Sequence, residues 1–247
     1  MDRGLFVSMT GAVHNMHAQT VHSNNLANAA TTGFRADFVD AVSLAVKDGE
    51  GHKSRVYAVA HSPATDFRKG SMQATGRDLD IAINGEGWLA VIGPNGEEAF
   101  TRAGSLHTDA FGALRNERGD QVLGNGGPVV IPEAESIEIA TDGTISVRAL
   151  GQGPEALVEV DRLKLVAAAP GDLNKGVDGR FYAAGAPPSL DANIRVSKGF
   201  VESSNVNPVN ELTQVMSLAR QFEMQMKMMQ TMSDTGDASV RLLQVQA

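Results

Sequence analysis

The sequence predicts an α+β protein that is mainly β, with an antiparallel β-rich central domain and terminal helices that pair as a coiled-coil-like stem. Two observations carry this prediction. Apolar residues recur at helical spacing at both ends of the chain, and short alternating segments separated by glycine-containing turns fill the middle. We expect a discontinuous helical assembly domain over 1–35 and 207–247, an extended connecting segment over 36–75 and a β-rich domain over 76–206.

The N-terminal helix is predicted from about residue 3 to residue 28. Its stripe has alternating spacings of four and three, as in a heptad repeat, and is apolar in its first half and polar at two later positions. Gly33 supplies a stop signal beyond it. The stripe consists of Leu5, Met9, Ala12, Met16, Gln19, Ser23 and Leu26.

The C-terminal helix is predicted over NPVNELTQVMSLARQFEMQMKMMQTMSD, with Asn210 as its N-cap and Pro208 tolerated just ahead of it. Gly236 is expected to weaken or kink the helix before its end. Two adjacent apolar lines make a wide stripe, typical of a helix that contacts more than one neighbour. The first line is Leu212, Met216, Ala219 and Met226, and the second is Val215, Leu218, Phe222, Met229 and Met232.

The middle of the chain reads as strands and turns. LDIAIN (79–84) alternates between apolar and polar residues, and GWLAVIG and EEAFTRAG flank Pro94-Asn95-Gly96, which indicates a hairpin with a type I′ turn. Turns recur at intervals of roughly 8–12 residues, which favours a sandwich or open barrel over alternating βα units. DFVDAVSLAV (37–46) fits either a short helix or a strand, and 47–55 is expected to be a polar loop.

The composition excludes several classes of function. The formal charge is −8, acidic residues are concentrated in the middle, and the ends are neutral, so we expect binding neither to nucleic acid nor to anionic membranes. The absence of cysteine excludes disulfides and thiolate chemistry. No segment approaches the roughly 18 apolar residues of a membrane span. The first 19 residues do not read as a signal peptide, because the apolar run is short and interrupted.

Candidate chemical sites are weak. His14, His17 and His22 spread too widely around one helix for three ligands of a single metal, and surface or packing histidines are the plainer interpretation. Gly85–Ala90 matches a loose dinucleotide-binding pattern, but a strand follows it where the pyrophosphate would need a helix. We therefore predict no metal and no cofactor.

Catalysis has equally little support. Asp78 and Asp80 alternate along one strand face, as do Glu133 and Glu135, and a cell-wall-cleaving glycosidase would need two carboxylates facing each other across a cleft. No nucleophile-elbow, zinc-protease or P-loop motif is present. The sequence predicts a protein that is not an enzyme, and wall cleavage is kept as an alternative.

The stretch SNNLANAATTGFR (23–35) resembles the signature of the flagellar basal-body rod, hook and related axial proteins. DLDIAINGEGWLAV with FTRAGSLHTDAFGALRNERGDQVLG resembles the β-domain core of that family, and SNVNPVNELTQVMSLARQFEMQMKMMQT resembles its C-terminal helix motif. The opening MDRGLFVSMTGA and the segment ARQFEMQMKMMQT are closer to the proximal-rod member than to the distal-rod member, which is the main alternative. The matching signature residues are Asn24, Asn25, Leu26, Ala27, Asn28, Thr32, Gly33 and Phe34.

This resemblance implies a structural subunit that self-assembles through its terminal helices into the periplasmic rod, transmits torque from motor to hook and is required for motility. It implies that the partners are copies of the chain, other proximal- and distal-rod proteins and the flagellar type III export apparatus. That apparatus reads N-terminal segments without cleaving them. The implied location is the basal body, with the helices as an inner tube and the β-domain as an outer layer.

We interpret SNNLANAATTGFR as a joint. Leu26 packs in the helix seam, the asparagine amides satisfy backbone groups where the helix frays, Gly33 permits the turn and Phe34 anchors the departing chain. A soluble periplasmic binding module and an enzyme are the competing classes, and neither needs the distinctive ends. The expected assembly residues are Leu5, Met9, Met16, Asn24, Asn25, Leu26, Asn28, Gly33, Phe34, Leu212, Met216, Leu218, Phe222, Met226 and Met229.

Overall fold

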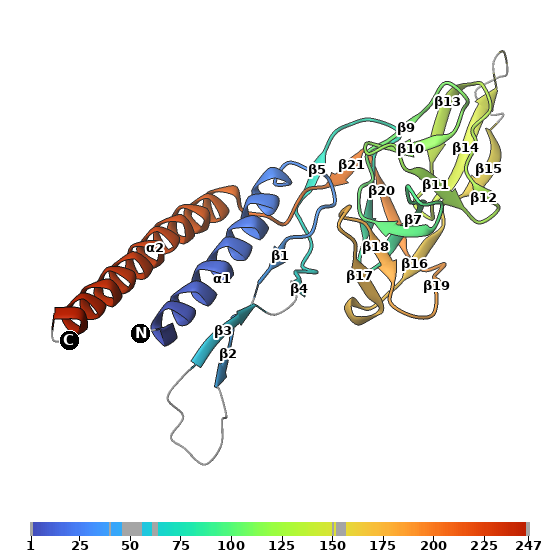
Figure 1. Cartoon of the computed structure of the whole chain (residues 1–247). Coiled ribbons are helices and arrows are strands. Elements are labelled where there is room, and N and C mark those ends of the chain that lie inside the picture. The colour runs from blue at the N-terminus through green and yellow to red at the C-terminus, as the bar shows by residue number, and fades with distance from the viewer. Residues whose placement is uncertain are drawn as a thin grey trace. The chain divides into compact units, whose positions relative to one another are not determined.

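The computed structural model describes residues 2–39, 41–45, 56–60, 64–149, 151 and 157–245. The chain forms two compact units. We call 1–29, 36–66 and 206–247 the helical unit, and 30–35 with 67–205 the β unit. The predicted class is confirmed, since the chain is mainly β with a helix at each end (Figure 1). The connecting segment expected over 36–75 is shared between the two units.

The helical unit is built around α1 (Asp2–Ala27) and α2 (Pro208–Val245). Asn207 caps α2, because its Oδ1 accepts hydrogen bonds from the backbone N–H groups of Val209 and Asn210 at 3.1 and 3.2 Å. The prediction of Asn210 as the N-cap was wrong, because the helix already begins at Pro208 and Asn210 lies within its first turn. α2 also continues through Gly236 without interruption.

Two short ladders complete the helical unit. β1 (Asp37–Phe38) pairs with β4 (Ala64–Thr65), and β2 (Ala41–Ala45) pairs with β3 (Val56–Ala60), both antiparallel. β1 and β3 contact α1. The segment that fitted either helix or strand is therefore strand, and the loop expected over 47–55 lies outside the described residues.

The β unit contains one large antiparallel sheet of ten strands in the order β17-β18-β8-β7-β11-β10-β9, with β12, β16 and β19 attached at its side. The strands are β7 (Trp88–Ile92), β8 (Glu98–Thr101), β9 (Leu106–Thr108), β10 (Leu114–Asn116), β11 (Gln121–Gly124), β12 (Gly127–Pro128), β16 (Leu165–Ala167), β17 (Leu173–Lys175), β18 (Phe181–Ala183) and β19 (Ser189–Leu190). A short 3-10 turn, Pro170–Asp172, precedes β17.

Three smaller sheets complete the β unit. They join β13 (Ala134–Ile139), β14 (Thr144–Ala149) and β15 (Leu157–Arg162), then β6 (Ile81–Asn84) with β20 (Arg195–Lys198), and β5 (Met72–Ala74) with β21 (Phe200–Glu202). The last two pairings bring the first and last strands of the β unit together. The segment through which the chain enters this unit therefore lies beside the segment through which it leaves.

Two predicted details of the β unit were wrong. Ile81, Ala82 and Ile83 are all buried, so β6 has no solvent face and does not follow the alternation predicted for it. The β7–β8 connection is also not a type I′ turn, because no described residue other than glycine has a positive φ. The turn is centred on Pro94 and Asn95, and it cannot be of type I′ because proline cannot reach positive φ. Within this connection, only Gly96, which follows the turn, takes the left-handed conformation, at φ 78°.

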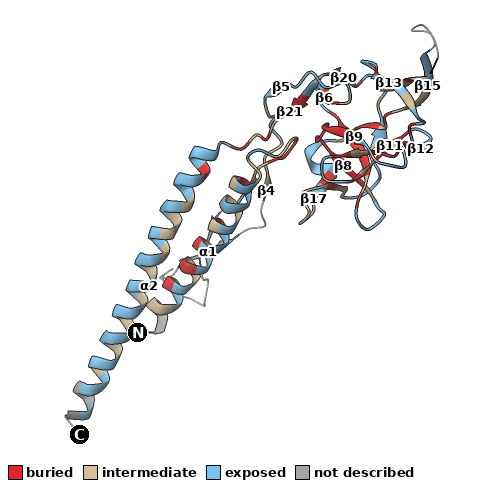
Figure 2. Cartoon of the chain, turned by 90° about the horizontal axis from the view of Figure 1, so that it is seen from above, coloured by how far each residue is buried: buried red, intermediate tan, exposed pale blue. Residues whose placement is uncertain are grey.

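The core of the β unit contains a larger aliphatic cluster and a smaller aromatic cluster. Many buried residues lie on the strands of this unit (Figure 2). Leu89, Val91 and Leu114 lie in the larger aliphatic cluster and are fully buried. Trp88 and Phe181 anchor the aromatic cluster, with ring centroids 4.5 Å apart. Phe67 packs edge-on against Trp88, with a centroid distance of 6.1 Å. Phe67, Trp88, Phe100 and Phe181 thus form one aromatic cluster within the β unit.

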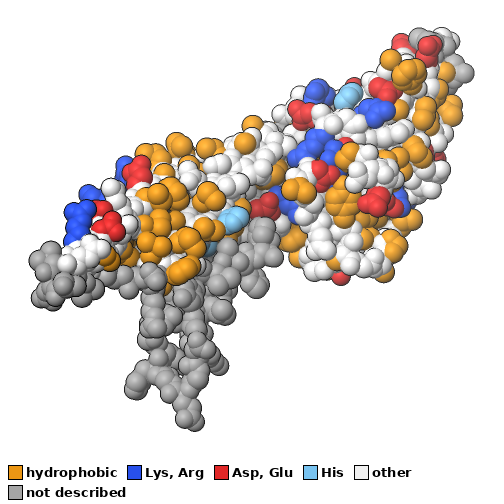
Figure 3. All heavy atoms as spheres, in the orientation of Figure 1, with side chains coloured by type: hydrophobic (Ala, Val, Ile, Leu, Met, Phe, Trp, Pro, Cys, Tyr) orange, Lys and Arg blue, Asp and Glu red, His pale blue; other side chains and the backbone are white. Residues whose placement is uncertain are grey.

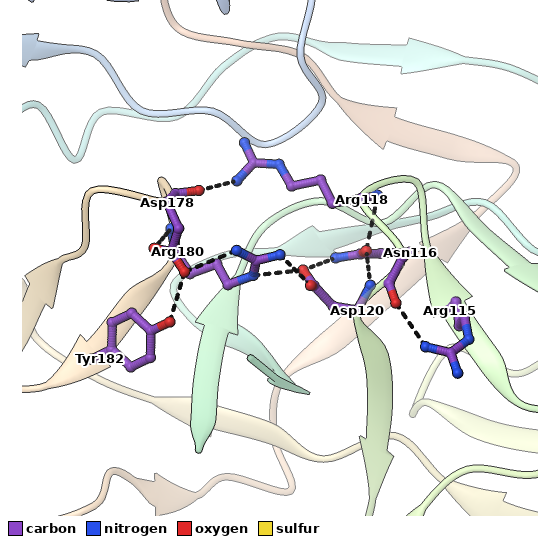
Figure 4. A network of polar contacts seen from close by, with 8 residues as sticks. Arg115, Asn116, Arg118, Asp120, Asp178, Arg180 and Tyr182 are labelled. Carbon is purple, nitrogen blue, oxygen red and sulfur yellow. Dashed lines mark hydrogen bonds and ion pairs between the residues drawn. The ribbon is translucent and has the colours of Figure 1, made fainter. Parts of the chain in front are cut away.

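A polar network joins two turns of the β unit (Figure 4). The guanidinium of Arg180 donates to the carboxylates of Asp120 and Asp178, and these carboxylates raise the pKa of Arg180. The hydroxyl of Tyr182 donates to Asp178 at 2.7 Å, and Arg118 reaches the Asp178 backbone carbonyl. Burial, together with the neighbouring carboxylate, raises the pKa of Tyr182 from 10.0 to about 12.

This network gives the β unit a defined alkaline limit. The neutral Tyr182 hydroxyl stabilises the fold fully below pH 10, the unfolded pKa, and its contribution is lost as the pH rises through the folded pKa of about 12. In the variant Tyr57→Phe, made for this measurement, Tyr182 is the only tyrosine left in the chain. We expect its phenolate absorbance to appear with a midpoint near 12 in the folded protein and near 10 in urea. Equal midpoints in the two states would contradict the network.

Candidate functional site

The face of α1 that contacts α2 is made of small and polar residues. A Cβ placed on Gly4 would lie 3.0 Å from the Met232 sulfur, and one placed on Gly11 would lie 2.7 Å from the Gln225 amide. The Ser8 hydroxyl lies 3.3 Å from the Met228 sulfur. Because α2 numbers fall as α1 numbers rise, the helices are antiparallel. Glycine and serine let the two backbones approach closely, and methionine fills the irregular space between them.

Where the end of α1 meets the start of α2, the side chains of His22 and Glu211 form a short polar contact. Nδ1 of His22 lies 2.6 Å from Oε2 of Glu211, and Glu211 is buried at the start of α2. A carboxylate in the first turn of a helix also interacts favourably with the positive end of the helix dipole. His22, one of the residues considered as a weak metal ligand, thus contacts α2. Among the described residues, no three histidine, aspartate or glutamate side chains gather as a metal site would require.

The predicted stripe of α1 is displaced from the observed contact face. Leu5 and Leu26 are partly covered and Ala12 is buried, but Met9 and Met16 are exposed by 43% and 51%. The pattern was predicted from the positions of large apolar residues, whereas the contact with α2 selects small ones. Met9 and Met16 consequently face away from α2.

The two predicted lines of α2 also have different surroundings. Leu218, Phe222 and Met229 belong to the partly covered line, which contacts α1. Leu212, Met216 and Met226 are 50%, 51% and 48% exposed. Within this chain, α1 covers only one of the two lines that the wide stripe predicted.

The asparagines at the C-terminal end of α1 bind backbone groups. Asn25 is 1% exposed, and its side-chain amide exchanges two hydrogen bonds with the Asp37 backbone, at 2.6 Å to the carbonyl and 2.9 Å from the N–H. Nδ2 of Asn28 donates to the Asn24 carbonyl at 2.9 Å. Asn25 therefore holds the end of α1 against β1. The Asn28 side chain adds a second donor to the Asn24 carbonyl, which also accepts from the Asn28 backbone N–H at 3.1 Å.

Gly33 lies in the β unit, where the chain passes close to the backbone of Arg102. Its φ is +66°, and a Cβ there would lie 2.2 Å from the Arg102 carbonyl carbon. Its N–H donates to the Glu202 carbonyl at 2.8 Å. Phe34 follows and is 3% exposed, with the Lys175 ammonium 4.1 Å from its ring centroid. Glycine is required here both for the backbone conformation and for space.

The sequence analysis missed a buried charged cluster beside Gly33. Oε1 of Glu202 accepts from Nη2 of Arg35 at 2.5 Å, and its Oε2 accepts from Nη1 of Arg102 at 3.0 Å. All three side chains are buried, and burial lowers the pKa of Arg102. The Gly70 N–H also donates to Oε1, at 3.0 Å. The sequence signal that could have indicated this cluster is the placement of charged residues directly after apolar ones, Glu202 in FVE, Arg35 in GFR and Arg102 in FTRAG.

The other residues considered for catalysis or cofactor binding take part in ion pairs and turns of the fold. Asp80 is buried and paired with Arg77 at 2.8 Å, while Asp78 is 72% exposed. Gly85 and Gly87 form a turn that leads directly into β7, so no helix N-terminus follows them. In the described part of the chain, no helix is long and apolar enough to cross a membrane.

Gly33→Ala should lower the free energy of unfolding of the β unit by more than about 2 kcal/mol, since a left-handed alanine and a backbone clash are imposed together. Gly76→Ala is the matched control, because Gly76 has φ +71° with nothing within 4 Å. It should cost about 1 kcal/mol from conformation alone. Urea unfolding of the two variants measures the difference, and equal losses would show that the close approach to Arg102 is unimportant.

Removing the Glu202 carboxylate should destabilise the β unit strongly. Glu202→Ala leaves two buried guanidinium groups without their shared partner, which typically costs about 3–5 kcal/mol. Asp78→Ala removes the carboxylate of the exposed Lys198–Asp78 pair and should cost less than about 1 kcal/mol. Denaturant titration followed by tryptophan fluorescence reports both, because Trp88 is the only tryptophan. A small loss for Glu202→Ala would contradict the role assigned to the cluster.

Comparison with known proteins places this geometry in a family. Residues 82–147 match the model described as "Flagellar hook protein FlgE/F/G D1 domain", and residues 197–242 match "Flagellar basal body rod FlgEFG protein C-terminal". The chain is 36% identical to flagellar basal-body rod protein FlgF of Salmonella typhimurium and 37% identical to that of Escherichia coli. Each alignment covers 98% of this chain and 99% of the relative.

Relatives named FlgG match as well, at lower identity. Flagellar basal-body rod protein FlgG of Bacillus subtilis is 30% identical, over 94% of this chain and 95% of the relative. The second family match begins on β20, includes Glu202 and covers most of α2. The chain therefore belongs to the family of flagellar basal-body rod proteins.

Proposed function

We propose that this chain is a structural subunit of the flagellar basal-body rod, closer to the FlgF type than to the FlgG type, and that its terminal helices build the shaft. The observation that carries the assembly role is the exposure of large apolar side chains along both helices. Phe6, Met9 and Met16 on α1 are between 43% and 51% exposed, and Leu212 and Met216 on α2 are 50% and 51% exposed. A soluble single chain gains nothing from such faces, whereas a subunit can bury them against its neighbours.

The two units then have different roles. The β unit buries its own core, and Glu202 joins the segment entering it to the segment leaving it through Arg35. The helical unit contains few buried apolar residues of its own, and we propose that it becomes a coiled-coil-like stem when neighbouring helices cover it. The predicted domains over 1–35 with 207–247, and over 76–206, are proposed to carry assembly and the outer layer respectively.

The partners follow from the family. We propose that copies of this chain and other proximal- and distal-rod proteins surround the helices, through the predicted assembly residues on α1 and α2. We further propose that the flagellar type III apparatus exports the chain without cleaving a signal, and that the assembled rod lies in the periplasm and transmits torque from motor to hook.

The competing classes have less support. The relatives are named as rod proteins, and the carboxylates that a wall-cleaving enzyme would need are either paired, as Asp80 is, or exposed, as Asp78 is. A periplasmic binding module would need a ligand site in the β unit, whereas the groove described below lies along the helices.

Phe222→Asp and Leu26→Asp should each abolish assembly while the β unit stays folded, because each places a charge on a helix face that neighbouring helices would cover. The measurements are swimming in soft agar, recovery of the chain in isolated basal bodies, and tryptophan fluorescence of the purified variant. Ser217→Asp, on an exposed polar position of α2, is the control and should leave motility near wild type. Motile cells with intact rods from the first two variants would refute the proposal.

A further inference from the structure

The orientation of α1 is opposite to that of an ordinary amphipathic helix. Its contact with α2 uses Gly4, Ser8 and Gly11, while large apolar side chains lie on the far side. These are Phe6, Met9, Val13 and Met16, exposed by 51%, 43%, 44% and 51%. Their spacings of three, four and three place them on one face, roughly opposite the glycines. We call these four residues the outer ridge.

The lack of charged side chains along α1 is typical of a helix whose outer ridge is covered by a partner. Residues 4–34 contain no aspartate, glutamate, lysine or arginine. An amphipathic surface helix normally carries charged or polar residues on the face away from its core. α2 has such residues, among them Arg220, Glu223 and Lys227, all exposed. The outer ridge therefore requires an apolar partner that imposes no unpaired charge on it.

The helical unit also presents a matching groove. It has a volume of about 870 Å³ and lies along α2, with Leu5 of α1 at its edge. Phe222, Met226 and Met229 line its apolar part, and Glu223, Lys227, Gln230, Ser233 and Asp234 add polar groups. Leu212 and Met216 extend the exposed apolar line of α2 beyond it. Figure 3 shows hydrophobic side chains gathered over the two helices on the face in view.

The ridge and the groove have similar lengths. At 1.5 Å per residue, Phe6 to Met16 spans roughly 15 Å, and Phe222 to Asp234 spans roughly 18 Å. Methionine is abundant on both surfaces, and its flexible side chain adapts to an irregular partner. The ridge faces away from α2 of its own chain, so it cannot enter the groove that this α2 lines.

We infer that the outer ridge of one copy packs into the groove of a second copy of this chain. This inference rests on the proposed function and names the surfaces that carry it. The two surfaces are different parts of the molecule, so the contact is heterologous, and each copy added leaves a free ridge and a free groove. Such a contact generates a helical row of subunits instead of a closed pair.

Paired cysteines test the contact directly, because the natural chain has none. Val13→Cys on the ridge and Met226→Cys in the groove are introduced together, and basal bodies are isolated and mildly oxidised. A disulfide requires Cα atoms within roughly 7 Å, so only a close contact reacts. We expect dimers and higher multimers on a non-reducing gel. Co-expressing the two single variants should give dimers, which shows that the bond joins different copies.

Val13→Cys with Ser217→Cys is the matched control, with the second cysteine elsewhere on α2, and it should give several-fold less product. The inference is overturned if both pairs react equally, or if Val13→Cys links to another rod protein while the chain is present in basal bodies. Absence of the unsubstituted chain from basal bodies would instead refute the proposed function.

A second measurement covers the case in which the cysteine variants fail to assemble. Val13→Lys should abolish swimming by placing an ammonium in the apolar groove, and Met226→Glu in the same chain should restore much of it by supplying a partner carboxylate. Ser217→Glu should not rescue Val13→Lys. Equal rescue by both glutamates, or by neither, would overturn the inference.

Discussion

The carboxylate of Glu202 is the group on which the two ends of the β unit depend. It accepts from Arg35, which arrives with the entering chain, from Arg102 at the end of the central hairpin, and from the Gly70 N–H. Three segments far apart in sequence therefore share one buried anion. Because an isolated buried guanidinium is costly, none of these segments can leave without exposing the others to an unpaired charge. Gly33 makes the arrangement possible by removing the side chain that would separate the entering backbone from Arg102.

Sequence reasoning located the helices well because their periodicity is a local property. Both ends of the chain were predicted as helix. α1 begins and ends within a few residues of the expected limits, whereas α2 begins as expected but continues through Gly236 to Val245, beyond the segment that was predicted to end at Asp234. The hydrophobic pattern did not identify the face of α1 that contacts α2, because such a pattern reports which residues avoid water, and not which neighbour covers them. Met9 and Met16 remain exposed in the single chain, as the proposed assembly through this face requires.

The charged cluster could not be predicted for a different physical reason. Arg35, Arg102 and Glu202 are far apart in the sequence and meet only through side-chain contacts in the folded β unit, so no local spacing links them. An arginine in a loop and a glutamate in a strand each read as surface residues, since isolated charges are seldom buried. Asn25 is an intermediate case. Its polar character indicated a joint, but its partner, the Asp37 backbone, became identifiable only when β1 was placed.

The contrast between the two units argues that the chain is built to be stable in part and completed by assembly. The β unit has continuous aliphatic and aromatic clusters and paired buried charges, so its fold does not need a neighbour. In the helical unit, the α1–α2 contact is made largely of glycine, serine and methionine. Small residues bury little apolar surface and so contribute little to stability, while Phe6 and Met16 remain in water. The free energy still available to these helices lies on their outward faces, and in the proposed assembly the helices of neighbouring subunits supply it.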